Sequence, residues 1–253
     1  MSATTGGENL ISASRRLAAG CERIRFHDPV RFVYNPLVYA RDGYEKYIRT
    51  WGTGKKHVIF LGMNPGPWGM AQTGVPFGEV SAVRDWLGIR ARILPRSKTH
   101  PRVEITGFDC HRSEVSGKRL WGLIRARYGS PGEFFSSQLV VNYCPLLFLD
   151  VSGRNLTPEK LRQPDRQALL LECDAHLRAV VKALAPRWLV GIGKFAQGRL
   201  ASMQRKEGWE EVTVVEIPHP SPASPAANRD WAGSVTAILT NSGVWSRFSE
   251  TTP

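Results

Sequence analysis

Four short runs of apolar residues, rich in β-branched side chains, stand out along the chain. They cover residues 58–61, 139–141, 188–192 and 212–217. In the first three runs apolar residues follow one another without alternation, which is typical of strands buried on both faces of a parallel sheet. Residues 30–34 are compatible with a further strand. The runs therefore predict the strands of a mostly parallel sheet.

Between the runs, apolar residues recur at the spacing of amphipathic helices. Strands that alternate with helices indicate an α/β fold, and right-handed crossovers place the helices on both faces of the sheet. We therefore expect a three-layer α/β/α sandwich around a central, mostly parallel four-stranded sheet. A single domain is expected over residues 9–245, between a loose N-terminus of residues 1–8 and a C-terminal tail of residues 246–253. The predicted helices cover residues 9–25, 79–87, 116–128, 158–184, 194–205 and 230–239.

Composition excludes several classes of protein. Hydrophobic residues make up 42% of the 253 residues, which is enough for a core and excludes a mainly disordered chain. No stretch approaches the roughly 18 apolar residues of a membrane span, and the first residues lack the pattern of a secretory signal. The four cysteines are too far apart in sequence for zinc or iron–sulfur motifs. We therefore expect no metal, no membrane partner, reduced thiols and an intracellular location.

The positive charge of the chain is concentrated in one segment. The formal net charge is +12, and residues 84–127 hold 11 basic and 4 acidic residues, a net charge of +7. Such a segment suits a polyanion such as a nucleic-acid backbone. A solvated surface that only aids solubility explains the same charge, so both interpretations stay open on charge alone.

Polar residues follow three of the predicted strands at the point where each strand ends. Asn64 follows the first run, Asn142 the second and His219 the fourth. In open α/β sheets ligands bind beyond the carboxyl ends of the strands, so we expect these side chains to converge on one rim. An amide both donates and accepts, so Asn64 can orient a water and Asn142 can pair with a nucleobase edge, although asparagine at a strand end is also a common cap. A histidine in a stiff, proline-rich loop suits charge stabilisation.

Two other features leave alternatives open. Residues 191–196 match the dinucleotide fingerprint G-x-G-x-x-A, which would indicate a dinucleotide-dependent oxidoreductase. Because they follow the third strong strand and not the first, a tight strand–helix turn is the better interpretation. Phe77 stands between small, stiff residues and suits either stacking on a planar base or packing in the core.

Seven blocks of the sequence surround these candidate residues. They are residues 61–67, 69–80, 84–89, 113–117, 144–149, 152–158 and 219–222. In these blocks the chain closely resembles the single-strand-selective monofunctional uracil-DNA glycosylases, and the resemblance covers roughly residues 30–235. It implies the α/β/α sandwich of the uracil-DNA glycosylase superfamily. It also implies a DNA-repair enzyme without a cofactor that hydrolyses the N-glycosidic bond of uracil in single- and double-stranded DNA.

The resemblance implies a catalytic role for two matched positions. Asn64 occupies the place of the asparagine that positions the hydrolytic water, and His219 that of the histidine beside the uracil O2. The backbone of Met63 matches a second partner of that oxygen. No lysine matches a Schiff-base nucleophile, so the expected product is an abasic site without strand cleavage.

The resemblance also implies the substrate-binding residues. Phe77 matches the aromatic that stacks on the flipped base, and Asn142 the amide that reads the uracil edge. Gly66 stands where relatives with a narrower substrate range place a bulky aromatic, so it leaves room for C5-oxidised uracils such as 5-hydroxymethyluracil. Met70, from the second block, belongs to the same group.

DNA contacts are expected from two segments and from Arg229. In the animal members an arginine follows His-Pro-Ser-Pro and wedges into the duplex, whereas this chain has Ala223 there. A short side chain fills a vacated stack poorly, which puts duplex activity in question. We expect a monomer whose partner is DNA containing uracil or an oxidised pyrimidine; the alternative is a non-catalytic nucleic-acid-binding module. The DNA-binding candidates are Ser116, Gly117, Lys118, Ser221, Pro222, Ala223, Ser224 and Arg229.

Overall fold

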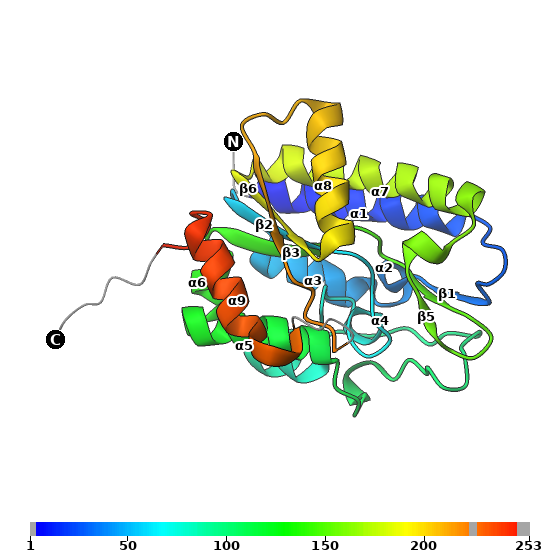
Figure 1. Cartoon of the computed structure of the whole chain (residues 1–253). Helices are drawn as coiled ribbons and strands as arrows, with labels where there is room; N and C mark the ends of the chain where they lie inside the picture. Colours follow the sequence, from blue (N-terminus) through cyan, green and yellow to red (C-terminus); the bar gives the residue numbers. More distant parts are fainter. Residues whose placement is uncertain (1–3, 223–226, 247–253) are drawn as a thin grey trace.

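The central sheet of the computed structural model, which describes residues 4–222 and 227–246, confirms the predicted parallel sheet (Figure 1). β2 and β3 are buried at every position, as their unbroken apolar runs predict. β7 lies at an edge and has exposed positions. The strands run in the order β3 (Gln138–Asn142), β2 (Val58–Gly62), β6 (Trp188–Ile192) and β7 (Thr213–Ile217).

Helices on both faces of this sheet complete the three-layer sandwich that the sequence predicts. The chain steps from β2 to β3 in one direction and from β3 to β6 and β7 in the other. Right-handed crossovers therefore put the connecting helices on opposite faces. In Figure 1, α1 (Thr4–Glu22) and α7 (Gln163–Leu184) lie side by side above the sheet. Below it lie α5 (Val115–Tyr128), α6 (Pro131–Phe135) and α9 (Ala227–Asn241), while α8 (Lys194–Glu207) packs against β6 and β7.

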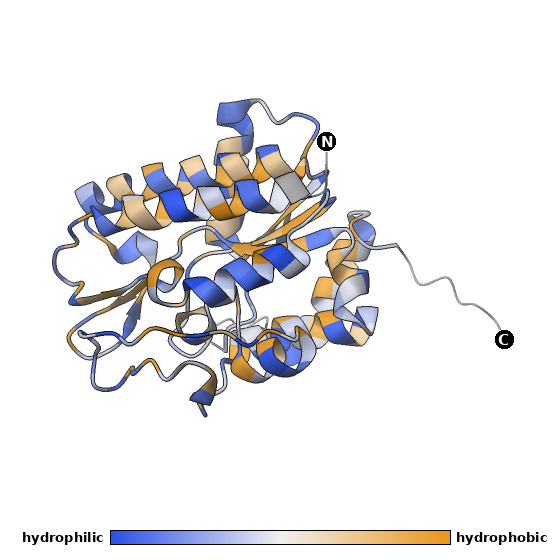
Figure 2. Ribbon diagram, turned by 180° about the vertical axis from the view of Figure 1, so that it is seen from behind, coloured by the Kyte–Doolittle hydropathy of each residue, from blue (hydrophilic) through white to orange (hydrophobic). Residues whose placement is uncertain are grey.

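The core forms where the apolar sides of the helices meet the sheet. Figure 2 shows mostly hydrophobic strands between helices that carry hydrophobic and hydrophilic residues on different sides. A helix that the sequence pattern did not predict, α3 (Arg41–Trp51), joins this core. Its Tyr47 is fully buried and donates a hydrogen bond of 2.8 Å to the Val140 carbonyl in β3. Within the described ranges, no helix is long and apolar enough to cross a membrane.

The N-terminus corrects one prediction. Residues 1–8 were expected to be loose, but α1 begins at Thr4. Gly6 and Gly7 lower the intrinsic helix propensity of this segment. However, a Cβ on Gly7 would lie 3.4 Å from the Thr53 side chain, so this turn of α1 packs closely against the end of α3. Tertiary packing therefore outweighs local propensity here.

A second, antiparallel sheet was not predicted as a separate unit. Its strands are β1 (Phe32–Tyr34), β4 (Leu147–Leu149) and β5 (Asn155–Leu156), in the order β1-β4-β5. The strand expected at residues 30–34 is β1 and belongs to this sheet, not to the central one. Strands of two or three residues are too short to give a periodic signal. The small sheet matters for the site because β5 begins at Asn155.

Short helical segments connect these elements, and one of them corrects a predicted helix, because the helix expected at residues 79–87 contains a π-helical turn. The long helix expected within residues 158–184 is α7, which begins at Gln163. The segments are α2 (Pro36–Tyr39), α4 (Met70–Thr73), the π-helical η1 (Ala82–Trp86), and the 3₁₀ turns η2 (Gly107–Asp109) and η3 (Pro158–Lys160).

The two glycines of the nominal dinucleotide fingerprint serve the turn between β6 and α8. A Cβ on Gly191 would lie 2.5 Å from the backbone nitrogen of Gln197. Gly193 has a φ of +85°, and a Cβ there would lie 3.1 Å from the Cβ of His219. Close packing of strand, helix and the His219 loop explains both glycines, in agreement with the tight-turn interpretation.

Candidate active site

A cavity of about 280 Å³ opens where β2 and β3 end. Asn64, Asn142 and His219, which are far apart in sequence, all line it, as expected for groups at the carboxyl ends of parallel strands. Every residue named above as catalytic or substrate-binding faces this cavity: Met63, Asn64, Gly66, Met70, Phe77, Asn142 and His219. The rest of the lining is Pro65, Glu114, Ser116, Asn155, Thr157 and Ser221.

The pairing of β2 with β3 fixes one wall of the cavity. Gly62 lies opposite Asn142 in the ladder. The pairing continues beyond the strands, because Tyr143 N–H donates to the Gly62 carbonyl and Cys144 N–H to the Met63 carbonyl, each at 2.9 Å. A Cβ on Gly62 would lie 2.5 Å from Asn142 Oδ1 and 2.4 Å from the Phe77 ring. A glycine at this strand end thus lets Phe77 and Asn142 meet.

Phe77 is held in a backbone conformation that is rare for a non-glycine residue. Its φ is +52°, in the left-handed region. Its carbonyl accepts hydrogen bonds from Trp121 Nε1 at 3.0 Å and from Glu79 N–H at 2.7 Å, and these contacts fix the turn. The ring packs with the core on one side, lines the cavity on the other and lies 6.2 Å from the His219 ring. Strain of this kind is common at binding sites.

Asn142 offers an unpaired hydrogen-bond acceptor. Its Nδ2 donates to Met70 Sδ at 3.3 Å, whereas its Oδ1 is buried and has no partner among the described residues. Buried polar atoms without a partner are uncommon in folded proteins. The amide can therefore accept a hydrogen bond from an N–H group of a ligand in the cavity.

Asn64 presents its amide oxygen in the same way. Its Nδ2 donates to the carbonyls of Leu146 at 3.2 Å and of Pro65 at 3.4 Å. Because both of these partners can only accept, the amide nitrogen must face them. The oxygen remains to accept a hydrogen bond from a water in the cavity.

His219 is a neutral donor in the lining of the cavity. Burial lowers the pKa of its imidazole below the ordinary value, so the ring is uncharged at neutral pH. Ser221 N–H donates to Nδ1 at 3.1 Å, which makes Nδ1 an acceptor and places the ring hydrogen on Nε2. A neutral ring with Nε2–H can donate to an oxygen that gains negative charge.

The predicted DNA contacts are only partly brought together. Ser116, at the start of α5, and Ser221 line the cavity, whereas Lys118, Pro222 and Arg229 are exposed outside it. Gly117 is buried, and a Cβ there would lie 2.2 Å from the Phe77 carbonyl. Ala223 and Ser224 lie outside the described residues.

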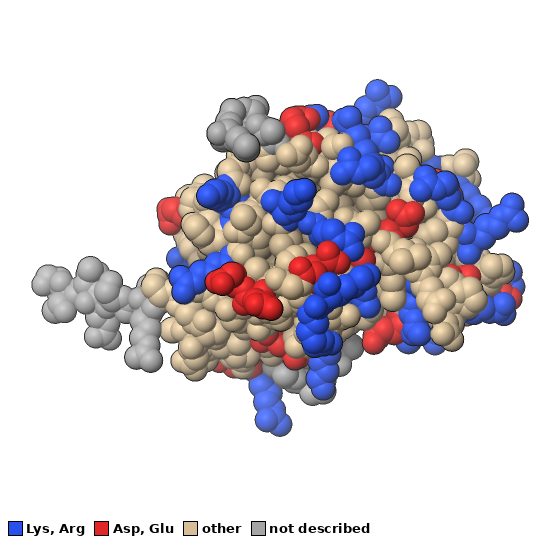
Figure 3. All heavy atoms as spheres, turned by 90° about the horizontal axis from the view of Figure 1, so that it is seen from above, with Lys and Arg blue, Asp and Glu red and all other residues tan. Residues whose placement is uncertain are grey.

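Figure 3 views the molecule from above, where basic side chains are spread over the surface with acidic ones among them. The informative basic residue is one that the sequence analysis did not single out. Arg119 of α5 donates to the Pro220 carbonyl at 2.9 Å and to Asn228 Oδ1 at 3.3 Å, so it ties the loop after His219 to the helix below the cavity.

Four cavity residues were missed by sequence reasoning: Pro65, Glu114, Asn155 and Thr157. Burial raises the pKa of the Glu114 carboxyl to about 7, with a smaller contribution from the charge of Glu79. Asn155 and Thr157 come from the segment that begins with β5. All four stand inside the sequence blocks that carried the resemblance, and that was the only signal for them. In the described part of the chain, no group of three or more His, Cys, Asp or Glu is placed to hold a metal ion.

Comparison with known proteins identifies the family of the chain. The family model of the uracil DNA glycosylase superfamily matches residues 51–235. The single-strand selective monofunctional uracil-DNA glycosylase of Rattus norvegicus is 45% identical over 94% of this chain and 85% of its own length. The corresponding protein of Bos taurus is 44% identical over 94% of this chain and 87% of its own. The chain therefore belongs to the single-strand selective monofunctional uracil-DNA glycosylases within that superfamily.

A solved structure supports the fold. The crystal structure of Pedobacter heparinus SMUG2 superposes with a TM-score of 0.64, covering 92% of this chain and 99% of that chain. The two share 14% sequence identity, so this likeness concerns the arrangement of helices and strands alone.

Proposed function

We propose that the protein hydrolyses the N-glycosidic bond of uracil in DNA, as a monomer, and leaves an abasic site. Membership of the glycosylase family supports uracil excision, and with it an intracellular compartment that holds DNA, either a bacterial cytoplasm or a nucleus. The observation that carries the proposal is the cavity itself. One chain brings an aromatic ring, an unpaired amide acceptor, a neutral histidine donor and a second amide oxygen to one space.

Recognition of uracil follows from the wall formed by Phe77 and Asn142. The target base leaves the stack, at a cost of a few kcal/mol, and stacks on Phe77. Uracil N3 carries a hydrogen that the unpaired Asn142 Oδ1 accepts. Cytosine has a lone pair at N3, so its binding would leave the buried amide oxygen without a partner, and this mismatch excludes it.

Bond cleavage depends on charge stabilisation. The C1′–N1 electron pair leaves with uracil, which becomes an anion, while the sugar becomes a cation. His219 Nε2–H and the Met63 backbone N–H stabilise the anion by the logic of an oxyanion hole. Water held by Asn64 then forms the bond to C1′, and the proton that it loses passes to solvent. Because the neutral Asn64 amide cannot act as a base, the water attacks only after the sugar has become positively charged.

The range of DNA substrates is set by the edges of the cavity. Gly66 has no side chain, and a Cβ there would lie 2.2 Å from Glu114 Oε1, so the space beside it is shared with the Glu114 carboxyl. C5-oxidised uracils such as 5-hydroxymethyluracil place their C5 substituent at this edge. The start of α5 at Ser116 and Gly117, the Ser221–Pro222 loop, Lys118 and Arg229 contact the phosphates. Since Ala223 cannot fill a vacated stack, excision is faster from single-stranded DNA than from a duplex.

Base release from end-labelled oligonucleotides tests this function. Each oligonucleotide carries one uracil, either single-stranded or opposite guanine, and is analysed with and without alkali. We expect alkali-dependent breaks at uracil, more rapid in the single strand. Asn64→Ala should lower turnover by on the order of 10²-fold without weakening DNA binding, because it removes only the water's acceptor. Salt-sensitive DNA binding without base release by the unmodified protein would instead show a non-catalytic binding module.

A further inference from the structure

Asn64 and Asn155 share one hydrogen-bond acceptor, the backbone carbonyl of Pro65. Asn64 Nδ2 and Asn155 Nδ2 each donate to the Pro65 carbonyl, at 3.4 Å in both cases. The two residues are far apart in sequence, since Asn64 follows β2 and Asn155 opens β5 of the second sheet. Both line the cavity. A single carbonyl thus holds two amide groups side by side in the wall.

This shared carbonyl also decides which way each amide points. An amide nitrogen and oxygen are hard to tell apart by shape, and their assignment rests on the hydrogen-bond network. Because a carbonyl can only accept, both nitrogens must face Pro65, and both oxygens must face away from it. Asn155 Oδ1 is buried and, like Asn64 Oδ1, has no hydrogen-bond partner within residues 4–222 and 227–246.

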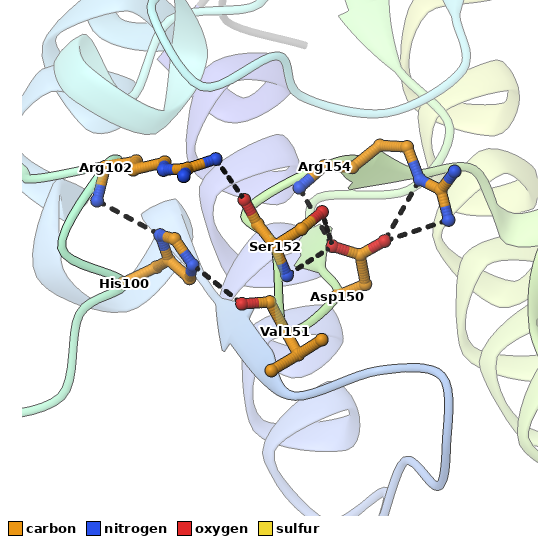
Figure 4. A network of polar contacts seen from close by, with 6 residues as sticks. All are labelled: His100, Arg102, Asp150, Val151, Ser152 and Arg154. Atoms are coloured by element: carbon orange, nitrogen blue, oxygen red, sulfur yellow. Dashed lines mark hydrogen bonds and ion pairs between the residues drawn. The ribbon is translucent and has the colours of Figure 1, made fainter.

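The fold holds Asn155 in a fixed position. Asn155 pairs with Leu149 in the β4–β5 ladder, and the preceding turn at residues 150–154 is closed by hydrogen bonds to Asp150 (Figure 4). Loss of the buried oxygen would cost this scaffold nothing, since no described donor uses it. An unpaired buried acceptor that the fold holds firmly in a cavity wall is suited to a ligand with a hydrogen to donate.

We propose that Asn155 is a second water-holding residue, so that the nucleophilic water donates one hydrogen to Asn64 Oδ1 and the other to Asn155 Oδ1. This inference rests on the proposed function. A water has two hydrogens, and two amide oxygens satisfy both without removing either. Its lone pairs are then left free to form the bond to C1′. Two neutral acceptors orient the water more tightly than one, which compensates for the lack of a carboxylate base at this position.

A double-mutant cycle tests the shared water. Single-turnover excision of uracil from a single-stranded oligonucleotide would be measured for Asn64→Ala, Asn155→Ala and the double variant, together with DNA affinity. We expect Asn155→Ala to lower the rate roughly 10- to 100-fold at unchanged affinity. The rate of the double variant should lie within about 3-fold of the rate of Asn64→Ala, because the effects of residues that act as one unit are not additive. If the loss of rate in the double variant equals the product of the two single losses, the proposal is overturned.

Asn35 supplies a matched control. Its Oδ1 is also buried without a partner among the described residues, but it lies outside the cavity lining. Asn35→Ala should leave the rate within about 3-fold of the unmodified protein and should combine with Asn64→Ala multiplicatively. A non-multiplicative result for this distant pair would show that the cycle reports general destabilisation, and the proposal would then fail.

Asn155→Asp separates water holding from support of the Pro65 loop. Aspartate keeps an acceptor for the water but has no N–H for the Pro65 carbonyl. Water holding predicts a rate above that of Asn155→Ala and a new acid limb in the pH–rate profile, as the introduced carboxyl titrates. Loop support predicts a rate no better than Asn155→Ala and no new limb. If the unmodified protein releases no uracil, the proposed function fails; if it does and the cycle is additive, only this inference fails.

Discussion

The turn at residues 150–154 and the cavity differ in how their polar groups are paired, although Asn155, which lines the cavity, directly follows that turn. In the turn, Asp150 Oδ1 accepts from Ser152 N–H at 2.8 Å, Ser152 Oγ at 2.7 Å and Arg154 N–H at 3.0 Å, and Oδ2 accepts from Arg154 Nε (Figure 4). His100 Nδ1 accepts from Arg102 N–H, so its Nε2–H donates to the Val151 carbonyl at 3.1 Å. The polar groups of the turn are thus paired, either within the turn or with His100 and Arg102.

The cavity leaves comparable groups without partners. Asn142 Oδ1, Asn155 Oδ1 and Glu114 Oε2 are all buried and unpaired within the described part of the chain. Pairing of buried polar groups stabilises a fold, whereas an unpaired one costs about 1–3 kcal/mol. The polar groups of the turn therefore stabilise the fold, whereas the proposed function assigns those of the cavity to the substrate. Changes in the cavity should alter activity more than stability, and changes in the turn the reverse.

The largest effect on activity is expected at the donor that meets developing charge. His219→Leu should lower kcat for uracil release on the order of 10²–10³-fold, because it removes a hydrogen bond to the departing anion. The thermal midpoint should fall only modestly, since leucine keeps the bulk and the change removes one described hydrogen bond, from Ser221 N–H to Nδ1. Single-turnover kinetics and a thermal melt of the same preparation measure both. Turnover near that of the unmodified protein would exclude His219 as the donor.

An intermediate effect is expected at the amide that reads the base. Asn142→Leu should reduce discrimination between uracil and cytosine roughly 10- to 100-fold, since one buried hydrogen bond is lost. It should leave the free energy of unfolding unchanged or higher, because an unpaired buried oxygen is removed. Competing uracil and cytosine oligonucleotides, with denaturant unfolding, test both parts. Unaltered selectivity, or a marked loss of stability, would break the contrast between cavity and turn.

The smallest effect on activity is expected in the turn. Asp150→Ala should keep kcat within about 3-fold but lower the thermal midpoint by roughly 3–6 °C. Hydrogen bonds from the Ser152 hydroxyl and nearby N–H groups, with the Arg154 charge, hold the pKa of Asp150 at about 2, below the ordinary 3.8. Because the folded pKa is the lower one, this stabilisation is complete above about pH 4 and is lost as the pH falls toward 2. The variant should therefore show a flatter stability profile over that range, and an unchanged acid limb would contradict the assignment.

Sequence patterns were most informative where an element is long and buried on both faces. The runs that became β2, β3 and β6 were located to within a residue or two, because consecutive β-branched residues have few other structural uses. The second sheet was not recognised as a unit, since β4 and β5 are two or three residues long and their pairing is antiparallel across a turn. The start of α1 at Thr4 was also missed, because the packing of Gly7 beside Thr53 joins segments that are far apart in sequence.

The residues of the candidate site also differ in whether the sequence could predict them. Asn64, Asn142 and His219 stand at strand ends, so parallel topology alone places them on one rim. Glu114, Asn155 and Thr157 reach the cavity from a helix start and from the second sheet, and no periodicity connects these segments with the rim. The left-handed φ of Phe77 is likewise a product of its surroundings, through the contacts of its carbonyl with Trp121 and Glu79.

The amino-acid sequence by itself determined the parallel sheet, the strand-end residues and the family to which the chain belongs. These depend on local periodicity and on short motifs, which a linear chain records directly. Tertiary structure decided which polar atoms are left unpaired and which amides share Pro65, because pairing depends on groups that meet only when distant segments pack. The capacity that we propose for the cavity, to hold a base and a water, therefore arises from contacts that no single segment specifies.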